Sequence, residues 1–526
     1  MSRFRRVIHS VASGYAALAA TAAYSLAAVP LALHYLSTER FGLWSLMAGI
    51  SGYLSLIDLG MSSSVSRLLI DHKDEQQTGV YGSLIKTGLL VLTVQSAIIL
   101  IIGFASAPLL SKLLAITVEL EADFIRLMRW QCVTLALGLV MRIFNHLLLA
   151  HQRFDIINYS QIVTLAVNFV LLWYFFHAGQ GVFSLAWSGL LASIAGTVVS
   201  LVTTCRLRLF PPAGSWGRAS LQQFKQIFAF GKDLFLVTVG HQMLTASQTL
   251  IITRRLGLAE SAVWYAGTRA FTLICWGIWR ISDVAGPAFA EMIVRREQTL
   301  LRGRYKAMLT LTASLSGFAA VAYAMCNSLF VSVWTHQKGH AIEWPPFNDV
   351  LLAVWMVIMA LLHCHNGFAL LSKKVGFMRY IYFVEGLVFI GASFLTAARG
   401  GLPAIIVCSI ICSTLFSGAY GVWRVSEFFE LPIREVALHW LAPMGRVLVL
   451  FVPLAITCWW LSGMLDNLVL RLILNIVLGG GVGLYLFLRY GLPVGFQREL
   501  LERVPQRINP LLTRVFATGS GGGVMN

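Results

Sequence analysis

The sequence predicts an all-α protein that crosses a membrane about fourteen times. Hydrophobic residues make up 57% of the 526 residues and charged residues only 12%, whereas about 25% of the residues in soluble domains are charged. The mean hydropathy is +0.75. The apolar residues are grouped into runs of about 20 residues, which is the length that a helix needs to span the hydrocarbon core of a bilayer. Composition and run length therefore both favour a polytopic membrane protein.

The predicted spans follow one another through short connections. The first run is too long for the core of a signal peptide and is followed by no small-residue cleavage site, so we expect it to be retained as the first span. The predicted spans are residues 8–34, 42–67, 82–109, 124–149, 156–177, 182–205, 228–253, 262–287, 307–334, 349–371, 377–398, 402–423, 441–463 and 468–488.

The distribution of lysine and arginine predicts the orientation. Most of these residues fall in alternate connections and in the two terminal segments, which is the positive-inside pattern of membrane proteins. Both termini are then expected in the cytoplasm, and the net charge of +17 reflects topology rather than nucleic-acid binding, since no basic stripe alternates with exposed aromatic residues. The cationic residues in the predicted outer loops are Arg40, Lys112, Arg254, Arg255, Lys338 and Arg399.

The chain divides near its middle. Residues 205–227 contain Pro211, Pro212 and an amphipathic stretch that starts at Leu221. A weak internal repeat at an offset of about 220 residues aligns 41–44 with 261–264, and repeated halves are common in transporters. We therefore expect an N-terminal lobe (1–210), a cytoplasmic linker (211–227), a C-terminal lobe (228–427), two further spans (428–490) and a cytoplasmic tail (491–526) whose end is disordered.

Metal and redox chemistry are not predicted. None of the eight cysteines forms a CxxC pair, and cysteines in or beside apolar spans act as small hydrophobic residues. His363 and His365 are two residues apart, so on a helix they point to different faces. We expect neither a cofactor nor a metal site.

The span 42–67 carries a carboxylate beside a flexible segment. Asp58 is followed by Gly60 and a serine triplet, and the span ends at Arg67. A charge in the centre of a bilayer costs about 2.5–3.5 kcal/mol on insertion scales, so such a residue usually faces a polar cavity. We expect the helix to be loosened over 60–64 and Asp58 to act in gating or coupling.

The span 262–287 predicts a cationic wall. Arg269 and Arg280 are eleven residues apart, about three helical turns, and therefore share a face, on which Trp276 also lies. Asp283 follows Arg280 by three residues and can pair with it. Two interpretations remain open: an anion-binding wall, or a structural Arg280–Asp283 pair with an outward-pointing Arg269.

Other polar residues within spans are candidates for the same pathway. His241, Thr245 and Gln248 continue a stripe from Thr238 at helical spacing, which also suits hydrogen bonds between helices. For the single residues, local pairing or snorkelling is the alternative interpretation. The remaining candidates are Lys86 and Arg142 as anion-binding residues, Gln161 and Asn168 as polar lining, and Glu385 as a coupling residue.

The balance of these charges favours an anionic substrate. Arginine suits phosphate because its planar guanidinium makes two parallel hydrogen bonds. The chain has no G-x-x-x-x-G-K-[ST] loop for ATP and no large outer loop for a catalytic site. We therefore expect a transporter and not an enzyme.

One block resembles a known family. Arg40-Phe41-Gly42-Leu43-Trp44, then Ile57-Asp58-Leu59-Gly60, then Ser66-Arg67 is similar to the pattern of Wzx-type polysaccharide transporters, relatives of the MATE-type multidrug exporters and the peptidoglycan lipid flippase. The resemblance implies a two-lobed helical bundle (6+6+2 spans) around a central cavity, with alternating access. The motif lies in residues 39–67, and the topology extends the resemblance over the chain.

The resemblance also implies the substrate. It is a polyprenyl-pyrophosphate-linked oligosaccharide, flipped across a bacterial inner membrane, with membrane lipid and other polysaccharide-assembly proteins as partners. Arg269, Arg280, Arg142, Lys86 and Arg67 would bind the pyrophosphate. Trp276, His241, Thr245, Gln248, Gln161 and Asn168 would line the cavity, and Asp58, Asp283 and Glu385 would couple or gate the movement. The alternatives are a cation-coupled drug or small-molecule exporter of the same fold and a membrane-embedded glycan polymerase or ligase.

Overall fold

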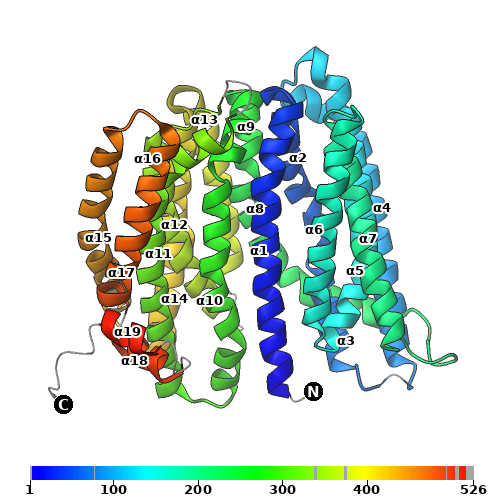
Figure 1. Ribbon diagram of the computed structural model, residues 1–526. Helices are drawn as coiled ribbons and strands as arrows, with labels where there is room; N and C mark the ends of the chain where they lie inside the picture. Colours follow the sequence, from blue (N-terminus) through cyan, green and yellow to red (C-terminus); the bar gives the residue numbers. More distant parts are fainter. Residues whose placement is uncertain are drawn as a thin grey trace. The chain divides into compact units, whose positions relative to one another are not determined.

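The computed structural model describes residues 3–75, 77–336, 341–371, 376–492, 494–503 and 509–516. Over these residues every regular element is a helix (Figure 1), so the predicted all-α class is confirmed. Eleven of the described helices are long and apolar enough to span a membrane, or twelve if one bent pair counts as a single span. The predicted total of fourteen is not confirmed. The predicted disordered end of the tail lies outside the described residues.

Two broken helices account for much of the difference in span number. The predicted span 262–287 is divided between α9 (Leu258–Gly267) and α10 (Arg269–Val294). The predicted spans 377–398 and 402–423 lie in one continuous stretch, Met378–Phe429. Gly401 interrupts that stretch with φ 60° and ψ −150°, which kinks α13 (Met378–Ser413). Only glycine adopts such backbone angles without strain.

The chain divides into two compact units, of which the first comprises residues 1–265 and 382–399. Within it α4 packs against α5, α6 packs against α7 and α1, and α2 packs against α8. The predicted lobe boundaries at 210 and 227 stay predictions. The helices of this unit are α1 (Arg3–Tyr35), α2 (Thr38–Leu54), η1 (Ser55–Asp58), α3 (Met61–Asp71), α4 (Val80–Leu113), α5 (Val118–Ala150), α6 (Phe154–His177), α7 (Phe183–Arg206), α8 (Leu221–Arg255) and α9 as far as Tyr265.

The second unit comprises residues 266–381 and 400–526 and is organised around α11. This helix packs against α10, α12, α15 and α16. An apolar cluster around Val447, Phe451 and Phe487 joins α15 to the last apolar helices. The further helices are α11 (Gln298–Trp334), α12 (Pro346–Leu371), η2 (Thr414–Gly418), α14 (Ala419–Phe429), α15 (Ile433–Gly463), α16 (Leu468–Asn475), η3 (Ile476–Val482), α17 (Gly483–Leu486), η4 (Phe487–Gly491), α18 (Val494–Arg503) and α19 (Asn509–Val515).

Small residues bring α2 close to α8 and α9. A Cβ added at Gly42 would lie 2.0 Å from the backbone oxygen of Leu258, and one at Gly49 would lie 2.9 Å from the Leu250 side chain. Ser45, one turn after Gly42, donates a hydrogen bond of 2.9 Å to the Ser261 carbonyl. The glycine of the Phe41-Gly42 motif is therefore required for helix packing.

We expect Gly42→Ala to destabilise the protein. The new methyl group meets a backbone atom, which cannot rotate away, so the helices must separate, and overpacking of this kind costs about 1–3 kcal/mol. Thermal unfolding of the purified protein, followed by tryptophan fluorescence, measures the effect. Gly189→Ala on α7 is the matched control, since nothing lies within 4 Å of its added Cβ. An unfolding midpoint for Gly42→Ala that equals the control would contradict the packing argument.

The segment before α8 is anchored to α4. Lys86 donates to the Gly217 carbonyl at 2.9 Å, and the Ser220 amide donates to the Thr87 hydroxyl at 3.0 Å. Ser220 also caps α8, whose first turns are formed by the amphipathic stretch expected to start at Leu221. This stretch is therefore continuous with the following apolar helix.

Candidate functional site

The first polar feature is the break between α2 and α3. The chain bends by 49° between the two helical segments. Leu59 (φ 50°) and Gly60 (φ 72°) both adopt the left-handed conformation at this bend. The serine triplet itself is helical, because α3 already begins at Met61. The predicted loosening of this span is thus confirmed as a sharp break, located at residues 59–60 rather than over the serines.

Asp58 caps α3 across this break. Its Oδ1 accepts hydrogen bonds from the Ser62 hydroxyl and from the Ser62 amide at 3.2 Å. A carboxylate at a helix N-terminus satisfies free N–H groups and interacts favourably with the helix dipole. The Asp58 backbone carbonyl accepts a hydrogen bond of 2.8 Å from Gln95 of α4. The break is therefore a built structure in which Asp58 is partly exposed.

The second polar feature is the exposed face of α10. Trp276 is 39% exposed, and Arg280 and Asp283 are also exposed. These three residues follow at helical spacing and share one side of the helix. Arg269 is the first residue of α10 and is partly buried. Charged side chains exposed from an apolar helix of a membrane protein face a polar environment in preference to lipid.

Asp283 pairs with a histidine of α12. Its Oδ1 lies 2.9 Å from Nε2 of His363, and the imidazole stacks on Trp279 with 4.8 Å between ring centroids. His365 is instead fully buried and contacts the Tyr305 hydroxyl. The two histidines thus point to different faces, as expected from their spacing. The described residues contain no group of three or more His, Cys, Asp or Glu that could hold a metal ion.

The polar stripe of α8 is largely internal. Gln248 is buried, and the Thr245 hydroxyl donates to the His241 carbonyl of its own helix at 2.9 Å. His241 is partly buried. The helix packs against α2, where Tyr53 bonds the hydroxyl of Ser247. These contacts place the stripe within the first unit, and its role in substrate binding stays a prediction.

The cations of the first unit have different surroundings. Lys86 is engaged by Gly217 and lies 5.8 Å from the Trp216 ring centre, which corresponds to the local pairing considered for it. Arg67 and Arg142 are exposed. The part of the anion site assigned to these three residues remains a prediction.

The remaining candidates lie on α6 and α13. Gln161 donates to the Thr21 hydroxyl at 3.3 Å. Asn168 has a buried side-chain oxygen that accepts no hydrogen bond from the described residues. Glu385 is only 2% exposed and belongs to the first unit.

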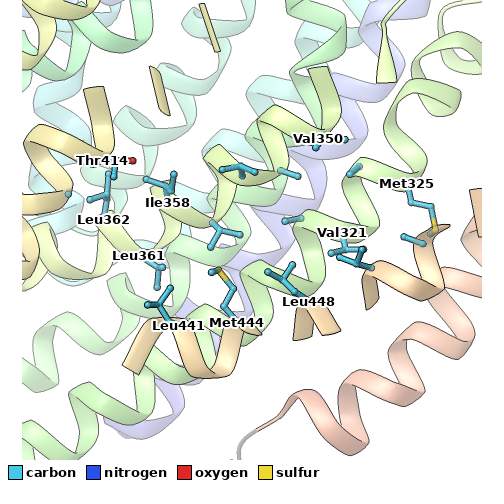
Figure 2. A pocket seen from close by; sticks show the side chains of 18 of the residues that line it. Val321, Met325, Val350, Ile358, Leu361, Leu362, Thr414, Leu441, Met444 and Leu448 are labelled. Atoms are coloured by element: carbon cyan, nitrogen blue, oxygen red, sulfur yellow. The ribbon is translucent and has the colours of Figure 1, made fainter. Parts of the chain in front are cut away.

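An apolar groove of about 1080 Å³ lies in the second unit. It is bounded by α11, α12, η2, α14 and α15, and Figure 2 shows aliphatic and thioether side chains around it, with the Thr414 oxygen at its edge. That hydroxyl is bonded to the Ile410 carbonyl at 2.7 Å. The groove therefore offers almost no polar contact to an occupant.

One face of α15 lines the groove along its length. The lining residues recur every three or four positions from Leu441 to Trp459, which corresponds to about 27 Å of helix, close to the thickness of a bilayer core of about 30 Å. This helix packs on α11 and α14, with few contacts to α12. The sequence pattern did not predict the groove, although the periodicity of the lining residues of α15 is a signal that indicates an apolar face.

A family model described as "Polysaccharide biosynthesis protein" matches residues 11–338. No curated protein matches the sequence.

Solved transporter structures share the fold. The lipid II flippase MurJ in an inward closed conformation has a TM-score of 0.68 at 11% identity, over 91% of this chain and 99% of that one. An inward-facing multidrug resistance MATE family transporter of the MOP superfamily has a TM-score of 0.64 at 15% identity, over 77% and 94%. A MOP superfamily transporter from Pyrococcus furiosus has a TM-score of 0.52 at 15% identity, over 80% and 94%. At these identities the likeness shows the fold alone.

Proposed function

Because the chain belongs to the polysaccharide biosynthesis protein family, we propose that it flips a polyprenyl-pyrophosphate-linked oligosaccharide across a bacterial inner membrane. In this proposal both termini are cytoplasmic, and the protein changes access from one side of the membrane to the other. The protein is a multi-pass membrane protein with the fold of MOP-superfamily transporters.

The observation that carries the proposal is the two-sided character of α12. One side places His363 beside Asp283 on the charged face of α10, and another side supplies Val350, Val357 and Leu361 to the apolar groove. A ligand with a charged head and a long apolar chain needs both kinds of surface. The second unit therefore offers chemistry suited to a polyprenyl pyrophosphate.

In this proposal the exposed guanidinium of Arg280 binds the pyrophosphate. The apolar groove takes the first isoprene units of the lipid. Trp276 and the stacked Trp279–His363 pair offer flat faces against which sugar rings pack. A hydrophobic cationic drug would instead favour an acidic, aromatic site, so the exporter of the same fold is the less favoured alternative.

We expect Ala353→Trp, which fills the groove, to lower the rate of lipid-linked glycan flipping at least about tenfold. Displacing just two chain carbons forfeits about 1.6 kcal/mol of burial, which corresponds to roughly tenfold in affinity. The measurement is flipping of a fluorescent polyprenyl-pyrophosphate glycan in proteoliposomes. Ala105→Trp is the matched control, since Ala105 is exposed on α4 and does not line the groove.

A shortened substrate separates the groove from a general defect. A glycan on a pyrophosphate with a single isoprene unit should be handled equally by the wild type and by Ala353→Trp. Export of labelled drugs without any movement of the lipid-linked glycan would refute the flippase proposal and support the exporter.

A further inference from the structure

A buried polar cluster joins the α9–α10 break to α11 and α12 in the second unit. At its centre is Asp349, which is fully buried in the first turn of α12. Its Oδ1 accepts a hydrogen bond of 2.6 Å from the Trp344 indole and one of 2.7 Å from the Asn327 amide. Asp349 has no part in the charged face of α10 or in the apolar groove described above.

The cluster also holds the break itself. The carbonyl of Gly267, the last residue of α9, lies 3.1 Å from the Asn327 amide and 3.1 Å from the Tyr323 hydroxyl. A Cβ added at Gly267 would lie 2.1 Å from the Trp344 ring. Asn327 and Trp344 therefore both connect Asp349 to the point where α10 begins.

Several acceptors share the Asn327 amide in this cluster. The two N–H groups of Asn327 face three acceptors within 3.1 Å, namely Gly267, Tyr323 and Asp349. Oδ2 of Asp349 and Oδ1 of Asn327 are buried and have no hydrogen-bond partner among the described residues. A buried carboxylate without a cation is costly, so such groups are neutralised or bind a cation. One proton on Asp349 neutralises the buried carboxylate.

Among the described residues, which leave out 337–340, no cationic group acts on the Asp349 carboxyl. Besides Trp344 and Asn327, the backbone amide and the hydroxyl of Ser328 act on this carboxyl as hydrogen-bond donors. The titratable neighbours are Tyr323 and Cys326 on α11, and Cys275 on α10 acts on Tyr323. All of these are neutral in their protonated forms. Glu343 in the preceding loop is exposed.

We propose that Asp349 is an exchangeable proton site that controls the α9–α10 break through Asn327 and Gly267. With the proton on Oδ2 of Asp349, the Asn327 amide donates to both Asp349 and the Gly267 carbonyl, and the bond to Gly267 stabilises the end of α9 at the break. When the proton leaves to water, the charged carboxylate draws the Asn327 and Trp344 donors more strongly, and Gly267 loses a partner. Since α10 carries Arg269 and Arg280, this would couple a proton to the anion site, a link that rests on the proposed function.

The test is hydrogen–deuterium exchange of the full-length protein in nanodiscs, without substrate, between about pH 5 and pH 8. Exchange in the peptide covering 262–275 is corrected for the intrinsic effect of pH. We expect the protection of this peptide against exchange to fall by about fivefold as the pH rises. This is the order of magnitude expected when Asn327 gives up a neutral hydrogen bond to Gly267 for a charge-assisted one to Asp349. Asp349→Asn should remove this response, and Glu343→Gln should keep it.

Two further measurements make the proposal falsifiable. Trp344→Phe keeps Asp349 and removes one hydrogen-bond donor to its carboxylate, so the pH midpoint of the exchange response should rise. This variant tests the proposal even if Asp349→Asn does not fold. Sodium varied at fixed pH should change nothing. A wild-type pH response in Asp349→Asn, an unmoved midpoint in Trp344→Phe, or a response to sodium alone would overturn the proton site. Because no substrate is present, these outcomes are independent of whether the flippase proposal holds.

Discussion

Arg280→Gln is expected to weaken the binding of a polyprenyl pyrophosphate roughly tenfold to a hundredfold. A hydrogen bond between charged groups is worth about 1.5–3 kcal/mol, and its loss leaves the pyrophosphate without one cationic partner. Arg280→Lys should recover only part of the affinity, since lysine keeps the charge but not the planar pair of donors. Binding of a labelled polyprenyl pyrophosphate to the purified variants measures the effect, with complementation of a flippase-deficient strain as the cellular readout.

A double variant separates this role from a structural one. If Arg280 served only to neutralise Asp283, removing both charges in Arg280→Gln/Asp283→Asn should restore function lost in the single variants. The observed partner of Asp283 is His363, at 2.9 Å. We therefore expect no rescue, and full recovery with normal protein levels in the membrane would make Arg280 a structural residue.

Asp58→Asn is expected to abolish transport while the protein still inserts and folds. The asparagine oxygen can accept the two hydrogen bonds from Ser62 that cap α3, so the break should persist without its charge. Loss of a cap costs about 1 kcal/mol, which Asp58→Ala should show as reduced thermal stability. The measurement is glycan export in a flippase-deficient strain, with membrane levels of each variant determined.

The two Asp58 variants distinguish capping from coupling. Ser62→Ala is the matched control, because it removes one partner of the carboxylate and leaves the charge in place. Export at wild-type levels by Asp58→Asn, together with a defect in Asp58→Ala, would show that Asp58 is needed only to hold the α2–α3 break.

The break in the second predicted span was visible in the sequence because its causes are local. Gly60 permits the left-handed backbone, and Asp58 is a residue type that caps helices. The predicted loosening over the serines is wrong, because a serine continues a helix once its hydroxyl is bonded to the preceding turn, as Ser64 is to the Gly60 carbonyl at 3.2 Å.

The hydrogen-bond and ion-pair partners of the polar residues could not be predicted from the sequence. Spacing places Arg280 and Asp283 on one face of the helix, but the hydrogen-bond partner of the Asp283 carboxylate is His363, 80 residues further along the chain. The sequence gives no reason to exclude Lys86 from an anion site, and its hydrogen bond to the Gly217 carbonyl is seen only in the structure. The sequence predicts Asp349 as the first residue of the span 349–371, and nothing nearby in the sequence indicates Trp344 and Asn327 as its donors.

The sequence by itself determined the class of protein, its apolar helices, the position of the main helix break and the family pattern around residues 40–67. These follow from composition and from periodicities within about 20 residues, which depend on local chemistry. The tertiary structure decided which side chains meet and where the apolar groove lies. Those features depend on how each helix is rotated about its own axis, and this rotation is set by packing between helices such as α11 and α15 that are distant in the chain.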